Sequence, residues 1–328
     1  MTQHMQGRIV PANAEWIAEA GQMIRGGALV AFPTETVYGL GADATNGEAV
    51  ARVFEAKGRP TFNPLIVHVA SLEQALIIGT FSPAARRLTE TFWPGPLTLV
   101  VPRMPSSDIS DLVSAGLPTV ALRSPDHPVA RALLIEAQRP LAAPSANLSG
   151  HVSATRAEHV AADLGGKAAL ILDGGPTVLG LESTVVSLVG DQTVLLRPGA
   201  VPAEAIEEVT AERLLRHEET PDRLTSPGQL ASHYAPRASL RLNAYDWRPD
   251  EAVLAFGGIA ERPARAFINL SPSGDLIEAA ANLFAALRTL DASGATSIAA
   301  TPIPPSGIGE AINDRLRRAA APREGGSG

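Results

Sequence analysis

Cysteine is absent from the 328 residues of the sequence. The chain therefore has no disulfides, thiolate metal ligands or cysteine nucleophiles, and a reducing compartment is expected. No stretch approaches the roughly 18 consecutive apolar residues that a transmembrane helix needs. The N-terminal residues also lack the basic and apolar segments of a signal peptide. We therefore expect a cytoplasmic protein with no membrane partner.

Lysine is scarce, since Lys57 and Lys167 are the only lysines among 27 basic residues. A lysine ammonium is a compact point charge that suits a phosphate or carboxylate oxygen, whereas arginine offers a planar fork. The net charge is −7, so no overall basic field draws the chain onto nucleic acid. Aromatic residues make up 4% of the chain and leave few side chains to stack on bases.

Three familiar catalytic motifs are missing as well, namely GxxxxGK[ST], GxSxG and HExxH. A nucleotide, if one is bound, must therefore be held by a scaffold other than a Walker-type phosphate loop. No dedicated carboxylate cage for a metal ion is evident, so no metal-ligating residues are assigned.

Residues 28–69 organise the rest of the chain. The apolar run 28–32, bounded by glycines and a proline, predicts a buried strand. A loop rich in hydroxyls and glycine is expected at 34–41, followed by a helix that ends at Gly58. A second strand is expected at 65–69. Polar residues concentrate in the loops of this unit, where chemistry usually lies.

Further elements follow along the chain. Helices are expected at 13–25, 71–78, 83–92, 128–138 (capped by Asp126) and 155–164. Strands are expected at 97–101, 118–123, 169–173, 184–189 and 193–197, with a glycine-rich loop at 173–184. Strands and helices alternate without strict βαβ regularity, so the expected fold is α/β, a twisted mixed sheet with packed helices.

The composition changes near residue 208. A charged, proline-containing stretch suggests a linker, and a smaller unit follows, with expected strands at 238–242, 252–256 and 297–301 and helices at 275–290 and 307–320. This pattern predicts a compact three-layer α/β domain. The expected division is a catalytic domain at 1–207, a linker or lid at 208–237, a small domain at 238–322 and a tail at 323–328.

Polar side chains gather at the expected strand ends: Lys57, Arg59, Asn63, His68, Arg123, Ser145, Asn147 and Arg197. Such cations and hydrogen-bond donors suit an anionic ligand such as a polyphosphate. Each signal also has a purely structural interpretation. Lys57 and Arg59 suit a solvated helix C-terminus, and His68 suits a satisfied core histidine. Ser145 and Asn147 suit ordinary turn chemistry.

Six motifs in combination resemble one family: PTETVYGL (33–40), KGR (57–59), NPLIVH (63–68), SANLSG (145–150), ESTVV (182–186) and LRPG (196–199). The chain is similar to the YrdC-type threonylcarbamoyl-AMP synthases in their longer two-domain form, from about residue 8 to 320. The resemblance implies a YrdC-like domain followed by a small Rossmann-like domain.

The implied reaction joins L-threonine, bicarbonate and ATP to give threonylcarbamoyl-AMP and pyrophosphate. It is a nucleotidyl transfer and the first step of threonylcarbamoyladenosine synthesis at position 37 of tRNA. The resemblance also implies magnesium as the cofactor, entering with ATP. The expected recipient of the product is a tRNA threonylcarbamoyl transferase, and direct contact with tRNA is expected to be weak or absent.

The resemblance assigns roles to residues of this sequence. Catalysis would fall to Lys57, Arg59, Ser145 and Asn147. ATP would be bound by Arg59, Asn63, Thr119, Ser145, Ser153, Arg197, His233 and Tyr234. Threonine would be bound by Thr36, His68, Arg123, Ala143 and Ser183. Residues 226–236 would form a lid over the nucleotide, and this sequence departs from many relatives at Gln229 and Ser232 within that lid.

Two other functions are compatible with parts of the sequence. A non-catalytic RNA-binding protein is disfavoured by the acidic balance and the few aromatic residues. YrdC-like domains also occur in larger carbamoyl-transfer enzymes and hydrogenase-maturation proteins. The maturation proteins carry cysteine-rich zinc modules and further domains, whereas this chain has no cysteine and 328 residues.

Overall fold

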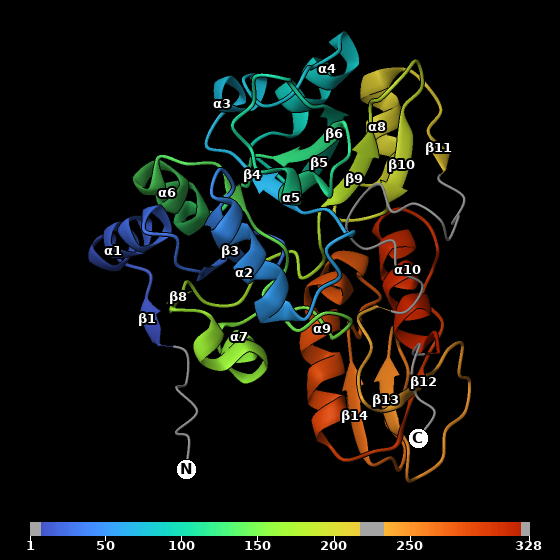
Figure 1. Ribbon diagram of the computed structural model, residues 1–328. Helices are drawn as coiled ribbons and strands as arrows, with labels where there is room; N and C mark the ends of the chain where they lie inside the picture. The colour runs from blue at the N-terminus through green and yellow to red at the C-terminus, as the bar shows by residue number, and fades with distance from the viewer. Residues whose placement is uncertain (1–7, 217–232, 323–328) are drawn as a thin grey trace.

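The computed structural model describes residues 8–216 and 233–322, which form two units (Figure 1). The larger unit, blue to yellow, contains an eleven-stranded sheet, and the smaller unit, orange to red, contains a four-stranded sheet. Residues 217–232 of the expected linker lie outside the described residues. The large sheet includes strand β11 (Leu215–Arg216), so it continues beyond the boundary at 207 that the composition suggested.

The large sheet is mixed, as expected, with strand order β1-β8-β2-β3-β7-β4-β6-β5-β9-β10-β11. Its strands before β11 are β1 (Ile9–Pro11), β2 (Val30–Pro33), β3 (Tyr38–Asp43), β4 (Ile66–His68), β5 (Leu97–Pro102), β6 (Thr119–Arg123), β7 (Leu141–Ala142), β8 (Leu170–Asp173), β9 (Thr184–Ser187) and β10 (Val194–Arg197). The neighbours β4 and β6 run parallel with His68 opposite Arg123. Both strands therefore deliver a polar side chain at the same edge of the sheet.

Helices cover this sheet and bury their apolar faces on it. They are α1 (Ala14–Arg25), α2 (Gly47–Lys57), α3 (Leu72–Leu76), α4 (Pro83–Phe92), α5 (Asp111–Ser114), α6 (Pro128–Ala137), α7 (Ala157–Leu164) and α8 (Ala203–Thr210), with a 3₁₀ turn at Gly165–Lys167. The ends of α2 follow from its sequence. Asn46 accepts hydrogen bonds from the first free backbone amides, and Gly58 ends the helix in the left-handed conformation, with φ of 60°.

The structure corrects several local expectations. The stretch expected as a loop at 34–41 contains most of β3, which forms an antiparallel hairpin with β2. The composition of this strand, which includes glycines and small residues, is typical of a loop. Because β3 is buried on both faces, it also lacks the alternation of apolar and polar residues that marks a half-exposed strand. The cap of α6 is His127 rather than Asp126, since the His127 ring accepts the hydrogen bond from the Val129 amide. Strands β1 and β11 and helices α5 and α8 were not expected.

The smaller unit is a parallel sheet of order β12-β15-β13-β14. Its elements are β12 (Ser239–Arg241), β13 (Ala252–Ala255), β14 (Ala266–Asn269), α9 (Leu276–Ala292), β15 (Ser297–Ala300) and α10 (Ile308–Ala320). Strand β14 was not expected. Both helices share one apolar cluster with Leu254 and Ile298. Both helices therefore cover the same face of the sheet. The sequence predicted a third layer on the opposite face, but among the described residues no helix covers that face.

The two units pack against each other. Arg288 of α9 forms an ion pair with Asp163 of α7 at 2.7 Å and donates to the carbonyls of Val152 and Ser153. Gly180 lies so close to α9 that a Cβ atom there would stand 2.4 Å from the Ala281 carbonyl oxygen. Among the described residues, no helix is long and apolar enough to cross a membrane.

Candidate active site

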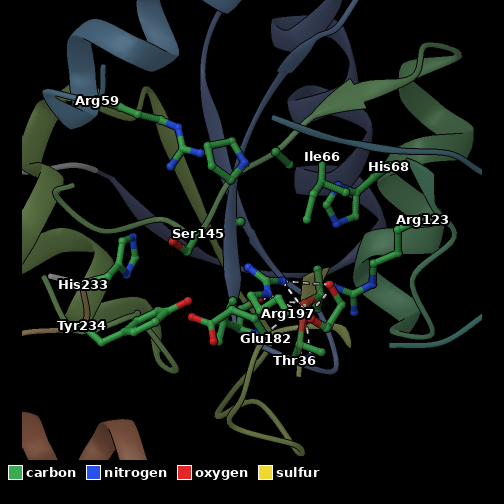
Figure 2. A pocket seen from close by; sticks show the side chains of 16 residues that line it. Thr36, Arg59, Ile66, His68, Arg123, Ser145, Glu182, Arg197, His233 and Tyr234 are labelled. Atoms are coloured by element: carbon green, nitrogen blue, oxygen red, sulfur yellow. Dashed lines mark hydrogen bonds between the residues drawn. The ribbon is translucent and has the colours of Figure 1, made fainter. Parts of the chain in front are cut away.

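A polar pocket lies where the strand ends of the large sheet meet the beginning of the smaller unit. Its lining comes from the β2–β3 turn, the ends of β4, β6 and β10, the residues after β7 and the residues before β9. Figure 2 shows two ends: Arg59, His233 and Tyr234 lie on one side, and His68 and Arg123 on the other. The predicted residues that line it are Thr36, Arg59, His68, Arg123, Ala143, Ser145, Ser183, Arg197, His233 and Tyr234.

At one end, Arg123 is fixed from three directions. Its Nε donates to the Gly95 carbonyl at 3.2 Å, and its Nη1 donates to the Thr36 hydroxyl at 2.9 Å. Its Nη2 forms an ion pair with Glu35 at 2.6 Å. The guanidinium is 3% exposed and oriented before any ligand arrives. A guanidinium held in this way is suited to a carboxylate, which it can bind with two hydrogen bonds.

His68 lies beside Arg123 on the neighbouring strand and packs edge-on against Phe32. Burial and the adjacent Arg123 charge lower its pKa from 6.5 to about 3, so the imidazole is neutral near pH 7. Its Nδ1 atom has no hydrogen-bond partner among the described residues. A buried imidazole nitrogen without a partner is costly, and the apolar-core interpretation of His68 does not account for it.

At the other end, Arg59 is held by the loop that follows α2. Its Nη2 donates to the Asn63 side-chain oxygen at 2.6 Å and to the Pro64 carbonyl at 2.9 Å. Asn63 thus orients Arg59 instead of lining the pocket. Burial, opposed by Tyr234 and reinforced by the charge of Arg197, lowers the pKa of Arg59 to about 10, so the side chain remains charged at pH 7.

Arg197 lies between the two ends, at the end of β10 (Figure 2). Its Nη2 donates to the Ser183 carbonyl at 2.8 Å and to the Ser183 hydroxyl at 3.1 Å. The backbone at Gly199, just after β10, lies directly against the backbone at the start of β9. A Cβ atom on Gly199 would stand 2.3 Å from the Thr184 amide nitrogen. Glycine is therefore required at 199 for Arg197 to reach the pocket.

Lys57 does not line the pocket, although it was expected to carry catalysis. It is 2% exposed, and its Nζ donates to the Ser145 carbonyl at 2.5 Å and to the Asn147 carbonyl. The lysine thus supports the turn that presents Ser145 to the pocket. Burial and the charge of Arg59 hold its pKa well below the ordinary value. The interpretation of 57–59 as a solvated helix end is wrong, since both cations are buried.

Three further predicted residues lie outside the pocket lining. The Asn147 side chain donates to the carbonyls of Leu148 and His151 and so stabilises its own turn. Ser153 donates to Glu182, which does line the pocket. Thr119 is at the first residue of β6, whereas Arg123 at the last residue reaches the pocket. That separation is about 13 Å at a strand rise of about 3.3 Å per residue.

His233 and Tyr234 are the described end of the expected lid. Their rings are 4.0 Å apart, and Tyr234 stacks on Phe284 of α9 at 5.5 Å. Burial lowers the pKa of His233, as do nearby cations beginning with Arg59, and burial raises the pKa of Tyr234, so both side chains are neutral near pH 7. Tyr234 has φ of 61°, an uncommon conformation for a bulky residue that often marks a functional constraint.

The sequence reasoning missed six lining residues: Thr34, Val37, Gly39, Ile66, Pro144 and Glu182. All but Pro144 lie within motifs that had been singled out, so the motif boundaries were the available signal. Glu35, which pairs with Arg123, and Arg315, which pairs with Glu182, were missed as well. No local pattern distinguishes Arg315 from the other arginines of α10.

A mixed α/β fold with buried arginines, hydroxyls and neutral histidines at its strand ends defines an enzyme for anionic substrates that uses no Walker-type loop. Comparison with known families agrees. The Sua5, YciO and YrdC family, described as "Telomere recombination", matches residues 22–199, and "Threonylcarbamoyl-AMP synthase, C-terminal domain" matches residues 201–321. The chain belongs to the threonylcarbamoyl-AMP synthase family, which confirms the resemblance seen in the sequence.

Individual relatives are similar over almost their whole length. The threonylcarbamoyl-AMP synthase of Bacillus subtilis is 44% identical over 331 residues, covering 95% of this chain and 94% of that protein. The crystal structure of Pyrococcus abyssi Sua5 complexed with L-threonine is 40% identical and covers 96% of both chains, with a TM-score of 0.87. A P. abyssi variant with a histidine and the next tyrosine changed to alanine gives a TM-score of 0.86 at 38% identity.

Proposed function

We propose that this pocket joins L-threonine, bicarbonate and ATP to form threonylcarbamoyl-AMP, with release of pyrophosphate. One observation carries the proposal: the pocket holds a fixed guanidinium, Arg123, at one end and two more, Arg59 and Arg197, toward the other (Figure 2). An amino acid has one carboxylate and ATP has a chain of phosphates, so the charges of the two substrates match the two ends. The crystal structure of P. abyssi Sua5 complexed with L-threonine supports threonine as one of the substrates.

The proposed chemistry starts at the threonine end. Arg123 binds the threonine carboxylate, with Thr36, His68, Ala143 and Ser183 around the rest of the amino acid. The threonine amine and bicarbonate give a carbamate with loss of water. A carbamate oxygen then forms a bond to the α-phosphorus of ATP, and the bond to the β-phosphate oxygen breaks. Pyrophosphate leaves with that electron pair.

Fixed cations stabilise this transfer. Arg59 and Arg197 would lie against the phosphates, with Ser145 donating a hydrogen bond, so negative charge that builds on the leaving group meets oriented donors. Lys57 contributes by holding the turn that carries Ser145. No side chain needs to become covalently linked to substrate, which fits a pocket without a cysteine or an activated serine.

The proposed magnesium ion belongs with the nucleotide. Among the described residues no group of three carboxylates or imidazoles could hold a metal ion. Glu182 is the only carboxylate among the described residues that line the pocket, and both of its oxygens accept from protein donors. The donor set therefore does not fit a resident metal site, and the ion would enter coordinated by ATP phosphates and water.

His233 and Tyr234 would close over the nucleotide. The cavity between the described residues is about 50 Å³, whereas sites for molecules of drug size usually reach about 300–1,000 Å³. ATP entry would therefore require the pocket to widen, and His233 and Tyr234, at the described end of the expected lid, are the side chains that we propose to move. Their return would exclude water from an adenylate that hydrolyses easily. Positions Gln229 and Ser232, where the sequence departs from many relatives, lie outside the described residues.

Downstream, the product would pass to a tRNA threonylcarbamoyl transferase. We propose that this chain itself makes little contact with tRNA, because its net charge is −7 and no overall basic field draws it onto nucleic acid. The pocket arginines Arg59, Arg123 and Arg197 are each at most 7% exposed and add little to the charge of the surface.

The test is pyrophosphate release from ATP, with and without L-threonine and bicarbonate. Release that requires both, with L-serine much poorer than L-threonine, is expected. Release that instead requires carbamoyl phosphate would assign a carbamoyl-transfer function. Absence of release by folded protein under all conditions would overturn the proposal and leave binding as the function to be tested.

A further inference from the structure

A carboxylate lies in the pocket that is proposed to bind ATP. Glu182 is 6% exposed and lines the pocket together with Arg59 and Arg197. In Figure 2 it appears between Tyr234 and Arg197. An unneutralised carboxylate there would repel a triphosphate, since charges a few ångströms apart interact strongly when water is excluded. The negative charge of Glu182 must therefore be neutralised by neighbouring groups.

Two side chains from other parts of the chain contact the Glu182 carboxylate. Ser153, in the loop before α7, donates to Oε1 at 2.5 Å. Arg315, on α10 of the smaller unit, donates from Nε to Oε2 at 2.8 Å. The Arg315 side chain is completely buried, at 0% exposure. The smaller unit thus supplies the cation that neutralises a carboxylate in the larger unit's pocket.

Arg315 also contacts two other parts of the pocket wall. Its Nη1 donates to the Pro198 carbonyl at 2.9 Å, next to Arg197. Its guanidinium carbon lies 5.1 Å from the centre of the Tyr234 ring, within the range of a cation–π contact. One side chain therefore contacts the Glu182 carboxylate, the corner that carries Arg197 and the described end of the lid.

The charge of Arg315 is balanced on its other side by Asp314, at 2.6 Å. Asp314 in turn pairs with Arg318 at 3.1 Å. Removal of Arg315 would leave Glu182 with only the Ser153 hydroxyl as a donor among the contacts described here. The Glu182 carboxylate could then turn toward the phosphates, or it could pair with Arg59 and Arg197, which are proposed to bind the phosphates.

We propose that Arg315 is a positioning residue for ATP, which holds the Glu182 carboxylate away from the phosphates and supports Tyr234 over them. This inference rests on the proposed function. It assigns the smaller unit a direct part in the active site: neutralisation of a pocket charge, beyond support of the lid. The residue touches no substrate, so its effect must pass through Glu182 and Tyr234.

The test is a cycle of variants assayed by pyrophosphate release: Arg315→Met, Glu182→Gln, and both together. Arg315→Met is expected to raise the KM for ATP about 100-fold, the loss typical of breaking a buried ion pair, with the KM for threonine changed far less. The double variant is expected to recover at least about tenfold of that loss, because the unpaired carboxylate is gone. Arg317→Met on the exposed face of α10 is the matched control and is expected to resemble the wild type.

A structural role alone would give a different result. If Arg315 only fixes the smaller unit in place, its loss impairs the fold and raises the KM for threonine as much as the KM for ATP. Equal rises in the two KM values, or a double variant as impaired as Arg315→Met, would overturn the proposal. Should Arg315→Met fail to fold by circular dichroism, Arg315→Lys replaces it. That variant keeps the charge but loses the planar fork, so we expect a rise of about tenfold in the KM for ATP, with the KM for threonine changed far less. An unchanged KM for ATP, or equal rises in the two KM values, would overturn the proposal.

The wild-type assay separates the two levels of inference. Wild-type protein that releases no pyrophosphate with threonine and bicarbonate defeats the proposed function. Active wild-type protein without recovery in the double variant defeats only the role of Arg315.

Discussion

Arg123 meets Glu35 at the end of the pocket that is proposed to bind threonine, with Nη2 of the arginine 2.6 Å from Oε1 of the glutamate. Both side chains are buried, at 4% and 9% exposure. Among the described residues, the Glu35 carboxylate has no other side-chain partner. The guanidinium that is proposed to bind a substrate carboxylate is therefore already paired with a carboxylate of the protein itself. Threonine, bound as proposed, would share this cation with Glu35.

The first prediction concerns that sharing. Glu35→Gln should tighten threonine binding by about tenfold, since the substrate carboxylate then supplies the only negative charge near Arg123. The free enzyme should lose about 3 kcal/mol of stability, because a buried cation is left without its partner. Isothermal titration with threonine and urea unfolding measure the two effects, with exposed Glu55→Gln as the control. Weaker threonine binding would show instead that Glu35 serves to orient Arg123.

The second prediction concerns Lys57. Lys57→Met should abolish pyrophosphate release and also lower the free energy of unfolding by about 2–4 kcal/mol, because the carbonyls of Ser145 and Asn147 lose their donor. A purely catalytic role, as the resemblance implied for Lys57, would instead lower activity with the stability unchanged. Lys167→Met is the matched control, since the chain's other lysine bonds only the Ala56 carbonyl among the contacts described here. Full activity in Lys57→Met would contradict the assignment.

The third prediction concerns the contact between the units. Arg288→Met should lower the free energy of unfolding by about 2–4 kcal/mol, because Asp163 and the carbonyls of Val152 and Ser153 lose a shared donor. Urea unfolding followed by circular dichroism measures the loss. Asp163→Asn tests the ion pair separately, and a double-mutant cycle gives the coupling. A loss below about 0.5 kcal/mol would mean that other contacts hold the units together.

The fourth prediction concerns pH. Burial lowers the pKa of His68 from 6.5 to about 3, so the folded protein excludes a proton that the unfolded chain accepts below pH 6.5. The stabilisation from neutral His68 is present above pH 6.5 and is lost as the pH falls toward 3. The slope from this residue approaches about 1.4 kcal/mol per pH unit. Urea midpoints at several pH values measure it, and His68→Gln should flatten the dependence. Identical slopes in both proteins would contradict this account.

Much of the larger unit could be predicted from the sequence. Helix α2 and its end at Gly58 followed from apolar spacing and from the glycine itself, and α4 was placed at its observed bounds. The chemistry of the strand ends at His68 and Arg123 followed from short apolar runs that terminate in polar residues. These signals are local in sequence, which is why pattern analysis could read them.

The features that could not be predicted from the sequence are of two kinds. Strand β3 carries glycines at 39 and 41, so its composition looks like a loop although its pairing with β2 makes it a strand. The second kind is a role that depends on distant partners. Arg315 stands on α10 beside other arginines, and only the docking of the units brings it to Glu182. Side chains such as Thr119 and Asn63 show the converse, since a motif match alone does not place a residue in the pocket lining.

The pairing of Glu182 with Arg315 has a consequence for protein synthesis. The two residues are 133 positions apart in the chain. Domains fold largely as they emerge from the ribosome, with N-terminal parts first. The large sheet can therefore form while α10 is still unmade, and during that interval the pocket carries an unneutralised Glu182 and no Arg315 beside the Tyr234 ring. If Arg315 acts as proposed, the protein would not be able to consume ATP until translation has passed α10 and the helix has docked.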